Sequence, residues 1–245
     1  MAQGLKQSGL VRSGYGCNNA CRFCDQGDWR ETRVEPSDDE VRALISQATE
    51  QASEGSGVVV FAGGEVTLRS ELTDWVELAR EQGARRVLIQ TNGRMLAYPR
   101  TAKRLVAAGA DVFAVALHGH IAPLHDWLTQ VPGSFDQALK GIENVRRAGA
   151  NVLVNTVITR SNFRHLPEIV ALLPRINASG IRFIWLRPEG HAEALAPSLA
   201  ASPDMVARYL QRALELARAL RRRVQFEVPD DLSGLEELLH VDPSA

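Results

Sequence analysis

The chain has 245 residues, of which 45% are hydrophobic and 23% are charged, a composition typical of a folded globular protein with room for one α/β domain. The 28 Lys and Arg residues nearly balance the 29 Asp and Glu residues, and the net charge of −1 gives no support for general nucleic-acid binding. No apolar run approaches the roughly 20 residues that cross a bilayer, and the N-terminus lacks the apolar segment of a secretory signal. We therefore expect a cytoplasmic protein that does not bind membranes.

Apolar strand-like runs alternate with helical patterns along most of the chain, which is typical of repeated β-α units around a parallel sheet. The predicted strands are 10–15, 58–63, 86–91, 111–117, 151–157 and 181–186. The predicted helices are 37–54, 69–82, 99–108, 134–148, 165–178 and 203–222. Several of these strands are continuously apolar, so we expect both faces of the sheet to be covered. The pattern predicts six β-α units in a single domain, 1–245, with a core at about 10–190.

The C-terminal part, 200–245, is predicted to hold the last helix, a weak strand at 224–228 and an acidic tail. The last helix ends in a basic run, Arg218 and Arg221 to Arg223. Such a run can bind nucleic acid, but cations at a helix C-terminus are also stabilised by the helix dipole, and we favour this second explanation. No linker, repeat or low-complexity segment divides the chain.

Three cysteines follow the first predicted strand. The segment GCNNACRFC places Cys17, Cys21 and Cys24 in a C-x3-C-x2-C pattern, and the chain contains no other cysteine. Thiolates bind iron–sulfur clusters, normally four to each [4Fe–4S] unit. Three thiolates would leave one iron open for a cofactor or substrate. The alternative is a structural zinc site with a histidine as fourth ligand, but such sites usually pair two short Cys or His hairpins, and the first histidine is His118.

This loop, with the aromatic Phe23 before its last cysteine, resembles the signature of the radical S-adenosylmethionine (radical SAM) superfamily, and the resemblance covers about residues 10–190. It implies that the three cysteines hold three irons of the cluster, while the amino and carboxylate groups of SAM chelate the fourth. It also places Phe23 near the adenine. The fold that we expect is a (β/α)6 partial TIM barrel, an open relative of the (β/α)8 barrel.

Two further segments match the family at the ends of predicted strands. FAGGEVTLR places Gly63, Gly64 and Glu65 where the family holds the amino group of SAM, although Val66 stands where the family often has proline. Glycines let the backbone approach a ligand closely, and a carboxylate pairs with an ammonium group. Gln90, Thr91 and Asn92 end the third strand and match a segment common in the family, although Asn-Gly is equally a turn signal.

The later strands supply the remaining candidates for cofactor binding. His118 is expected near the ribose or sulfonium of SAM, although a lone histidine is often only structural. Asn155 lies in a buried strand, where a polar side chain needs a hydrogen-bond partner such as a ribose hydroxyl. Leu186 is expected to cover the adenine. Arg187 could meet a carboxylate of SAM or substrate, or form an ordinary ion pair.

The resemblance implies reductive cleavage of SAM to methionine and a 5′-deoxyadenosyl radical, which abstracts a hydrogen atom from a substrate. It also implies an external electron donor such as flavodoxin or ferredoxin. We expect a peptide or protein substrate, because little chain follows the sixth strand to cover the mouth of the barrel. Three alternatives remain: a step in small-molecule cofactor or natural-product biosynthesis, a non-catalytic partner that binds cluster and SAM, and a zinc-binding scaffold. The polar residues expected at the mouth are His120, Arg187, Glu189 and His191.

Overall fold

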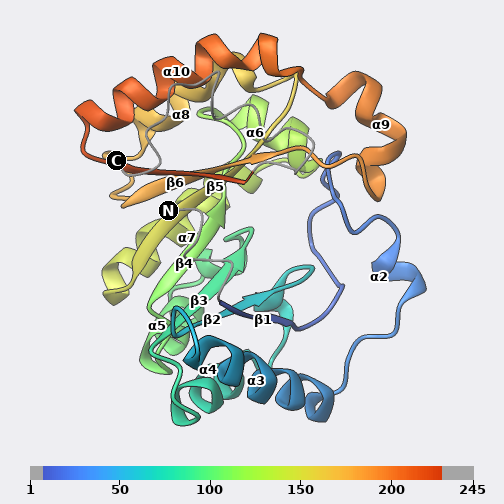
Figure 1. Ribbon diagram of the computed structural model, residues 1–245, viewed down its shortest axis with the longest axis vertical. Helices are drawn as coiled ribbons and strands as arrows, with labels where there is room; N and C mark the ends of the chain where they lie inside the picture. Colours follow the sequence, from blue (N-terminus) through green and yellow to red (C-terminus); the bar gives the residue numbers. More distant parts are fainter. Residues whose placement is uncertain (1–7, 228–245) are drawn as a thin grey trace.

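The computed structural model describes residues 8–227, and within them seven strands form a single parallel sheet in the order β1 to β7 (Figure 1). The strands are β1 Gly9–Arg12, β2 Val58–Ala62, β3 Arg86–Thr91, β4 Val112–Ala116, β5 Asn151–Ile158, β6 Gly180–Trp185 and β7 Arg223–Glu227. Because sequential strands are spatial neighbours and all pairs are parallel, the carboxyl ends of all the strands lie at one edge. The loops at this edge carry the candidate site.

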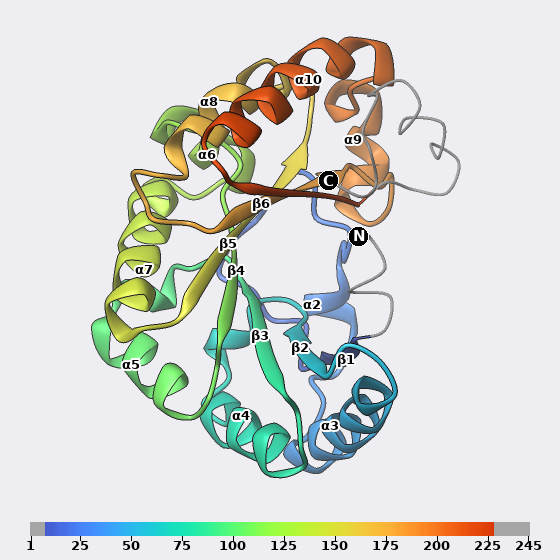
Figure 2. The same cartoon turned by 60° about the vertical axis from the view of Figure 1, so that its left-hand side comes forward.

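The α-helices are α2 Trp29–Thr32, α3 Asp38–Ser53, α4 Leu72–Glu81, α5 Pro99–Ala107, α6 Ala122–Thr129, α7 Ser134–Ala148, α8 Leu166–Leu172, α9 His191–Leu199 and α10 Pro203–Ala219. Three 3₁₀ turns, η1 Val66–Leu68, η2 Met95–Ala97 and η3 Phe163–His165, follow β2, β3 and β5. Helices α3, α4, α5, α7, α8 and α10 surround the outer side of the curved sheet (Figure 2). This arrangement is the open barrel of β-α units that the sequence predicts.

The strands bury apolar side chains on both faces. On the outer face, Phe61, Phe113 and Phe183 are fully buried in one large core that also includes Trp75 of α4 and Ile142 of α7. A separate small cluster fills the interior at the amino-terminal half of the sheet, with members Val60, Leu88 and Ala114. The two clusters explain the continuous apolar runs of the strands, since a strand that is buried on both faces does not alternate.

The helix boundaries follow from local chemistry at their ends. At the start of α3, Ser37 accepts a hydrogen bond from the Glu40 backbone N–H, and the Glu40 carboxylate accepts one from the Ser37 N–H, which together form a capping box. At the end of α7, Gly149 has a φ of 100°, and its N–H donates to carbonyls of the last turn. The helix predicted over 165–178 is shorter than expected, since α8 ends at Leu172, two residues before Pro174, which cannot continue a helix.

Two features of the carboxy-terminal half differ from the prediction. The weak strand predicted at 224–228 is β7, which pairs in parallel with β6, so the sheet has seven strands where the pattern predicts six. Two short helices, α6 and α9, were not predicted, and both lie at the carboxyl edge of the sheet. The mouth of the barrel is therefore bordered by more regular structure than the sequence indicates.

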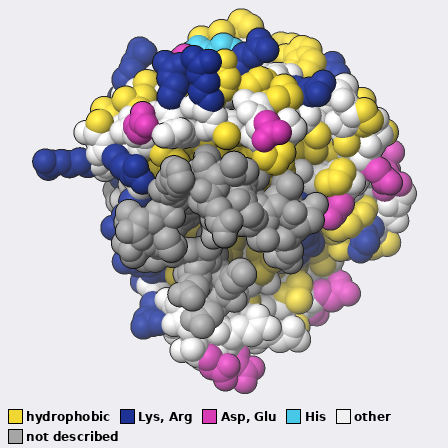
Figure 3. All heavy atoms as spheres, turned by 45° about the horizontal axis from the view of Figure 1, so that its top comes forward, with side chains coloured by type: hydrophobic (Ala, Val, Ile, Leu, Met, Phe, Trp, Pro, Cys, Tyr) yellow, Lys and Arg dark blue, Asp and Glu magenta, His cyan; other side chains and the backbone are white. Residues whose placement is uncertain are grey.

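No helix within residues 8–227 is long and apolar enough to cross a membrane. Acidic, basic and apolar side chains are interspersed on the face drawn in Figure 3.

Candidate functional site

The cysteine loop, residues 13–28, crosses the carboxyl edge of the sheet and is held at both sides. It leaves β1 beside the loop that follows β2. Farther along, the N–H groups of Ala20 and Arg22 donate to the last carbonyls of α6, with N···O distances of 3.1 Å in both cases. The N–H of His191, at the start of α9, donates to the Cys24 carbonyl at 2.9 Å. The position of each cysteine is thus set by a different neighbouring element.

The chemistry of the three cysteine side chains fits an iron–sulfur cluster. All three are unpaired and half-buried, and burial raises the pKa of each thiol. The pKa of Cys21 is raised further because ionisation of Cys17 or Cys24 would bring a like charge close to it. Thiolates gathered in this way need a positive partner, which iron supplies.

A single metal ion fits this loop less well than a cluster does. Within residues 8–227, no three His, Cys, Asp or Glu side chains are grouped around one point that an ion could occupy. In an iron–sulfur cluster, by contrast, each thiolate binds a different iron atom, so the three sulfur atoms need not surround a single point.

Glu65 is the centre of a buried hydrogen-bond network beside Cys17. Only 2% of Glu65 is exposed. Its Oε1 accepts hydrogen bonds from the Thr67 N–H at 3.1 Å, from the Thr67 hydroxyl, and from the Thr91 hydroxyl at 2.6 Å. Its Oε2 accepts one from the Asn92 N–H at 2.6 Å. Burial raises the pKa of Glu65, and these donors oppose that rise. The network fixes the end of β3 to the loop after β2.

Asn92 extends this network to the cysteine loop. Its side-chain amide donates to Asn18 Oδ1 at 2.7 Å and lies 3.9 Å from the Cys17 sulfur. Arg94 adds a second connection, because its guanidinium donates to the Asn18 carbonyl and to Asn19 Oδ1, the latter at 3.1 Å. Glu65, Thr91, Asn92 and Cys17, which sequence reasoning took from separate motifs, are therefore in one polar network.

A second group gathers at the other end of the cysteine loop. The rings of Phe23 and His118 meet edge to face with centroids 4.5 Å apart, and Phe23 packs in the same small apolar cluster as Leu186. His118 is 3% exposed, and burial holds its pKa well below the usual 6.5, so the imidazole is neutral at neutral pH. The Val157 N–H donates to His118 Nδ1 at 3.3 Å, which leaves the proton on Nε2.

The remaining predicted residues differ in their surroundings. Asn155, on β5, is 8% exposed, and within the described chain its Oδ1 is buried without a hydrogen-bond partner. A buried acceptor of this kind needs a donor, which a ligand hydroxyl can supply. Gln90 is half-buried on β3, whereas Arg187 is exposed beyond the end of β6.

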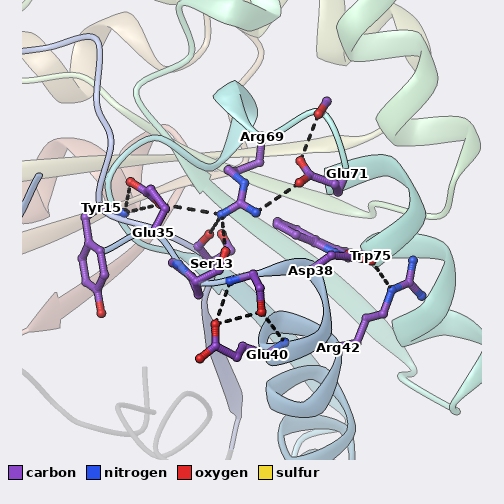
Figure 4. A network of polar contacts seen from close by, with 12 residues as sticks. Ser13, Tyr15, Glu35, Asp38, Glu40, Arg42, Arg69, Glu71 and Trp75 are labelled. Carbon is purple, nitrogen blue, oxygen red and sulfur yellow. Dashed lines mark hydrogen bonds and ion pairs between the residues drawn. The ribbon is translucent and has the colours of Figure 1, made fainter. Parts of the chain in front are cut away.

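Sequence reasoning missed three side chains that support the cysteine loop. Gln26 donates from Nε2 to the Gly63 carbonyl at 2.5 Å, directly joining the cysteine loop to the segment 63–65. Glu35 and Arg69 form a polar network around the start of the loop (Figure 4). Arg69 is in the motif FAGGEVTLR, which gave a signal, but Glu35 and Gln26 lie in irregular segments where no periodicity or motif marks them.

The fold and the site together define an open barrel of β-α units with a three-thiol loop after its first strand. Residues 11–173 match the sequence profile of the Radical SAM superfamily, and the chain belongs to this superfamily. Membership implies a [4Fe–4S] cluster and SAM, as the sequence analysis expected.

Curated relatives differ in name. The chain is 31% identical over 193 residues to an AdoMet-dependent heme synthase of Nitratidesulfovibrio vulgaris, a match that covers 77% of this chain and 50% of that protein. It is 30% identical over 177 residues to the mycofactocin maturase MftC of Mycolicibacterium smegmatis, with 72% of this chain and 43% of that protein covered. The chain thus spans about half the length of the curated relatives that it matches.

Solved structures of radical SAM enzymes share the fold. SuiB of Streptococcus suis bound to the precursor peptide SuiA superposes with a TM-score of 0.76 at 16% identity, over 96% of this chain and 52% of that chain. SuiB bound to S-adenosylmethionine gives a TM-score of 0.72 at 16% identity, over 90% of this chain and 49% of that chain. The prediction of a partial TIM barrel of the radical SAM type is confirmed.

Proposed function

We propose that this chain binds a [4Fe–4S] cluster through Cys17, Cys21 and Cys24 and uses it to cleave SAM reductively. The observation that carries the proposal is the joining of the three-thiol loop to Glu65 and Asn92 in one network at the carboxyl edge of the sheet. When bound, the cluster would supply the electron for the reductive cleavage of SAM, and with it the means to remove a hydrogen atom from a substrate. The electron comes from an external low-potential donor such as flavodoxin or ferredoxin.

The residues near Cys17 suit the methionine end of SAM. Gly63 and Gly64 let the backbone come close to a ligand, and a side chain at Gly64 would collide with the carbonyls of Tyr15 and Gly16. The buried carboxylate of Glu65 offers a negative charge to the ammonium group. Its four hydrogen-bond donors hold that charge in place, so it needs no rearrangement when the ligand binds.

The residues near Cys24 suit the nucleoside end. Phe23 and Leu186 provide apolar surface for the adenine. The Nε2–H of His118 is a donor and the Oδ1 of Asn155 an unsatisfied acceptor, and ribose hydroxyls can bond to both kinds of group. Arg187, at the exposed end of β6, is the candidate for a carboxylate of SAM or substrate.

For the substrate we propose a peptide or protein segment. The fold is shared with SuiB, solved in complex with a precursor peptide, and the sequence with a protein named as a maturase. A second candidate, a small molecule of the tetrapyrrole class, is favoured by sequence identities of 31% and 34% to an AdoMet-dependent heme synthase and an Fe-coproporphyrin III synthase.

The cluster assignment is tested by replacing each cysteine. We expect the anaerobically reconstituted protein to hold about four irons, because three cysteines serve one cluster, and to release 5′-deoxyadenosine from SAM with dithionite. Cys17→Ala, Cys21→Ala and Cys24→Ala should each abolish this release. Glu143→Gln, at an exposed ion pair on α7, is the control and should behave like the unaltered protein. A Cys21→Ala protein that still cleaved SAM would refute the assignment.

The substrate class is tested by a SAM-bound crystal structure. A peptide requires an open channel from the reactive carbon of the SAM adenosyl group to the surface of the barrel mouth. A closed pocket with room only for a small ligand would rule out the peptide and favour the tetrapyrrole class.

A further inference from the structure

The start of the cysteine loop, residues 13–16, is called the stem here, because it continues β1 and leads directly to Cys17. One side of the stem is bound by the backbone of the segment 63–65. The Gly64 N–H donates to the Gly14 carbonyl at 2.9 Å, and the Glu65 N–H donates to the Gly16 carbonyl at 2.7 Å. The stem therefore carries Cys17 on the same short stretch of chain that borders the candidate SAM segment.

The other side of the stem is bound by Glu35, from the irregular segment before α3. Its carboxylate accepts hydrogen bonds from two consecutive backbone groups, the Tyr15 N–H at 3.0 Å and the Gly16 N–H at 2.6 Å (Figure 4). Hydrogen bonds to an ionised acceptor are among the strongest in proteins. Gly14 has no side chain at this place, and a Cβ there would collide with Glu35 Oε2.

Arg69, which follows η1, completes the enclosure. Its Nη1 donates to the Ser13 carbonyl at 2.9 Å and to the Pro36 carbonyl at 3.1 Å, and lies 3.6 Å from Glu35 Oε2. Its guanidinium is itself held, because it pairs with Glu71 at 3.2 Å and lies 4.8 Å from the ring centroid of Trp75. Arg69 thus connects the stem, the segment that bears Glu35 and the loop after β2.

The backbone of the segment 63–65 packs closely on the stem, since a Cβ at Gly63 or Gly64 would collide with carbonyl oxygens of the stem. A small cavity of about 40 Å³ is lined by stem residues, Gly64, Glu65 and the side chains of Glu35 and Arg69. On this side, Glu35 and Arg69 hold the stem through polar contacts.

We propose that Glu35 and Arg69 are positioning residues that hold Cys17 at a fixed distance from the segment 63–65. Both side chains act through the backbone of the stem. That the ligands are an iron–sulfur cluster and SAM rests on the proposed function, whereas the enclosure of the stem is a property of the chain alone. Binding and electron transfer to SAM require a fixed geometry, and a displacement of about 1 Å can cost a hundredfold in rate.

The side chain of Glu35 is 45% exposed, and an ion pair of this kind contributes little to global stability. We therefore expect the melting temperature of Glu35→Ala to stay close to that of the unaltered protein. The side chain of Arg69 is only 19% exposed and makes two ion pairs and two hydrogen bonds to backbone carbonyls, so Arg69→Met should lower the melting temperature more. Methionine keeps the apolar contact with Trp75 while removing the guanidinium. Glu143→Gln, which loses two ion pairs on α7, is the control.

The first measurement is hydrogen exchange on the full chain without cluster. In Glu35→Ala we expect exchange of the Tyr15 and Gly16 amides to rise about tenfold, the factor that a loss of 1.4 kcal/mol produces. Glu35→Gln keeps one acceptor oxygen and should give a smaller rise. The control should show none. Unchanged protection in Glu35→Ala would overturn the proposal, whether or not the chain binds a cluster.

The second measurement is the dissociation constant of SAM in the reconstituted protein, together with the EPR spectrum of the reduced cluster with and without SAM. We expect Glu35→Ala and Arg69→Met to retain iron but to bind SAM about tenfold more weakly, with an altered spectrum in the presence of SAM. SAM binding within twofold of the control would refute the positioning role. An unaltered protein that binds neither cluster nor SAM would refute the proposed function, and the exchange measurement would still decide on the enclosure of the stem.

Discussion

At the scale of single residues, the site combines a buried carboxylate with two buried neutral histidines. The backbone N–H of His118 donates to Nδ1 of His125 at 3.0 Å, and the two rings are stacked with centroids 5.7 Å apart. Burial lowers the pKa of His125 from 6.5 to about 4, and that of His118 is also held well below its usual value. A proton on either ring would be a buried charge, and at His125 the nearby Asp126 offsets the cost of burial only in part. The pair therefore supports the site only while both rings are neutral.

This arrangement predicts an acid-sensitive stability. The unfolded chain binds protons at both histidines below pH 6.5, whereas the folded chain resists protonation until about pH 4 at His125. The free energy of unfolding should therefore fall as the pH drops through this window, by about 3 kcal/mol for His125 alone. Urea unfolding between pH 4.5 and 7 measures it. His125→Asn keeps an acceptor for the His118 N–H and should show a smaller slope.

His125→Leu provides the comparison for that experiment. It also removes the titrating ring, but leaves the buried backbone N–H of His118 without an acceptor, so its stability should be lower than that of His125→Asn at every pH by about 1 to 3 kcal/mol. An unchanged pH slope in both variants would contradict the assignment of the acid sensitivity to His125.

The site residues that could be predicted from the sequence are those that belong to a motif with a fixed local spacing. The cysteines and the segment 63–65 were found because a ligand loop and a close backbone approach each need several particular residues in a row. Glu35, His125 and Arg94 could not be found in this way. Glu35 and Arg94 act through contacts with the cysteine loop, and His125 acts through its contact with His118. A lone Glu, His or Arg has many other uses.

At the scale of elements, the cysteine loop depends on two short helices. Helix α6 offers its last carbonyls to the N–H groups of Ala20 and Arg22, and α9 offers its first N–H group to the Cys24 carbonyl. Eight and nine residues long, α6 and α9 are too short to show a helical period in the sequence, and each contains a proline. The sequence pattern therefore could not predict these two helices. Without them, little regular structure was expected at the mouth of the barrel.

The contact between α9 and the cysteine loop depends on Gly190. Its φ is 60°, and a Cβ there would lie 2.5 Å from the Asp25 carbonyl oxygen and collide with the Gly27 nitrogen. We expect Gly190→Ala to push the start of α9 away from the loop, break the hydrogen bond from His191 to Cys24, and lower the iron content after reconstitution. Iron per chain and the melting temperature measure the effect.

Gly133→Ala is a matched control for that substitution. Gly133 has a similar φ of 80°, but a Cβ there meets no atom within 4 Å. The control should lose about 1 kcal/mol of unfolding free energy through backbone strain and retain its iron. Equal iron contents in the two variants would show that the contact between α9 and the loop has no part in holding the cluster.

At the scale of the whole molecule, the parallel sheet could be predicted because six of its strands are apolar and separated by clear helical patterns. The seventh could be predicted only as a weak strand, since RVQFE has two apolar side chains and three polar ones. Its place in the sheet comes from tertiary contacts: Val224 and Phe226 pack against the outer core, and Phe226 stacks on Phe183 with ring centroids 6.2 Å apart. Apolar and polar side chains alternate along β7, so that one face of this strand is apolar and packs against the core.

This edge strand predicts a difference between two shortened chains. A chain ending at residue 227 keeps β7, whereas a chain ending at residue 222 loses it and exposes the hydrogen-bonding edge of β6 together with Phe183 and the core around it. Because each apolar side chain buried in a core contributes about 1.5 to 3 kcal/mol when burial is complete, the partly buried Val224 and Phe226 should together contribute about 3 kcal/mol. Urea unfolding of the two chains measures that difference directly, and segments beyond residue 227 are missing from both. Equal unfolding free energies would mean that β7 adds no stability, and that the six strands before it form the complete cooperative unit.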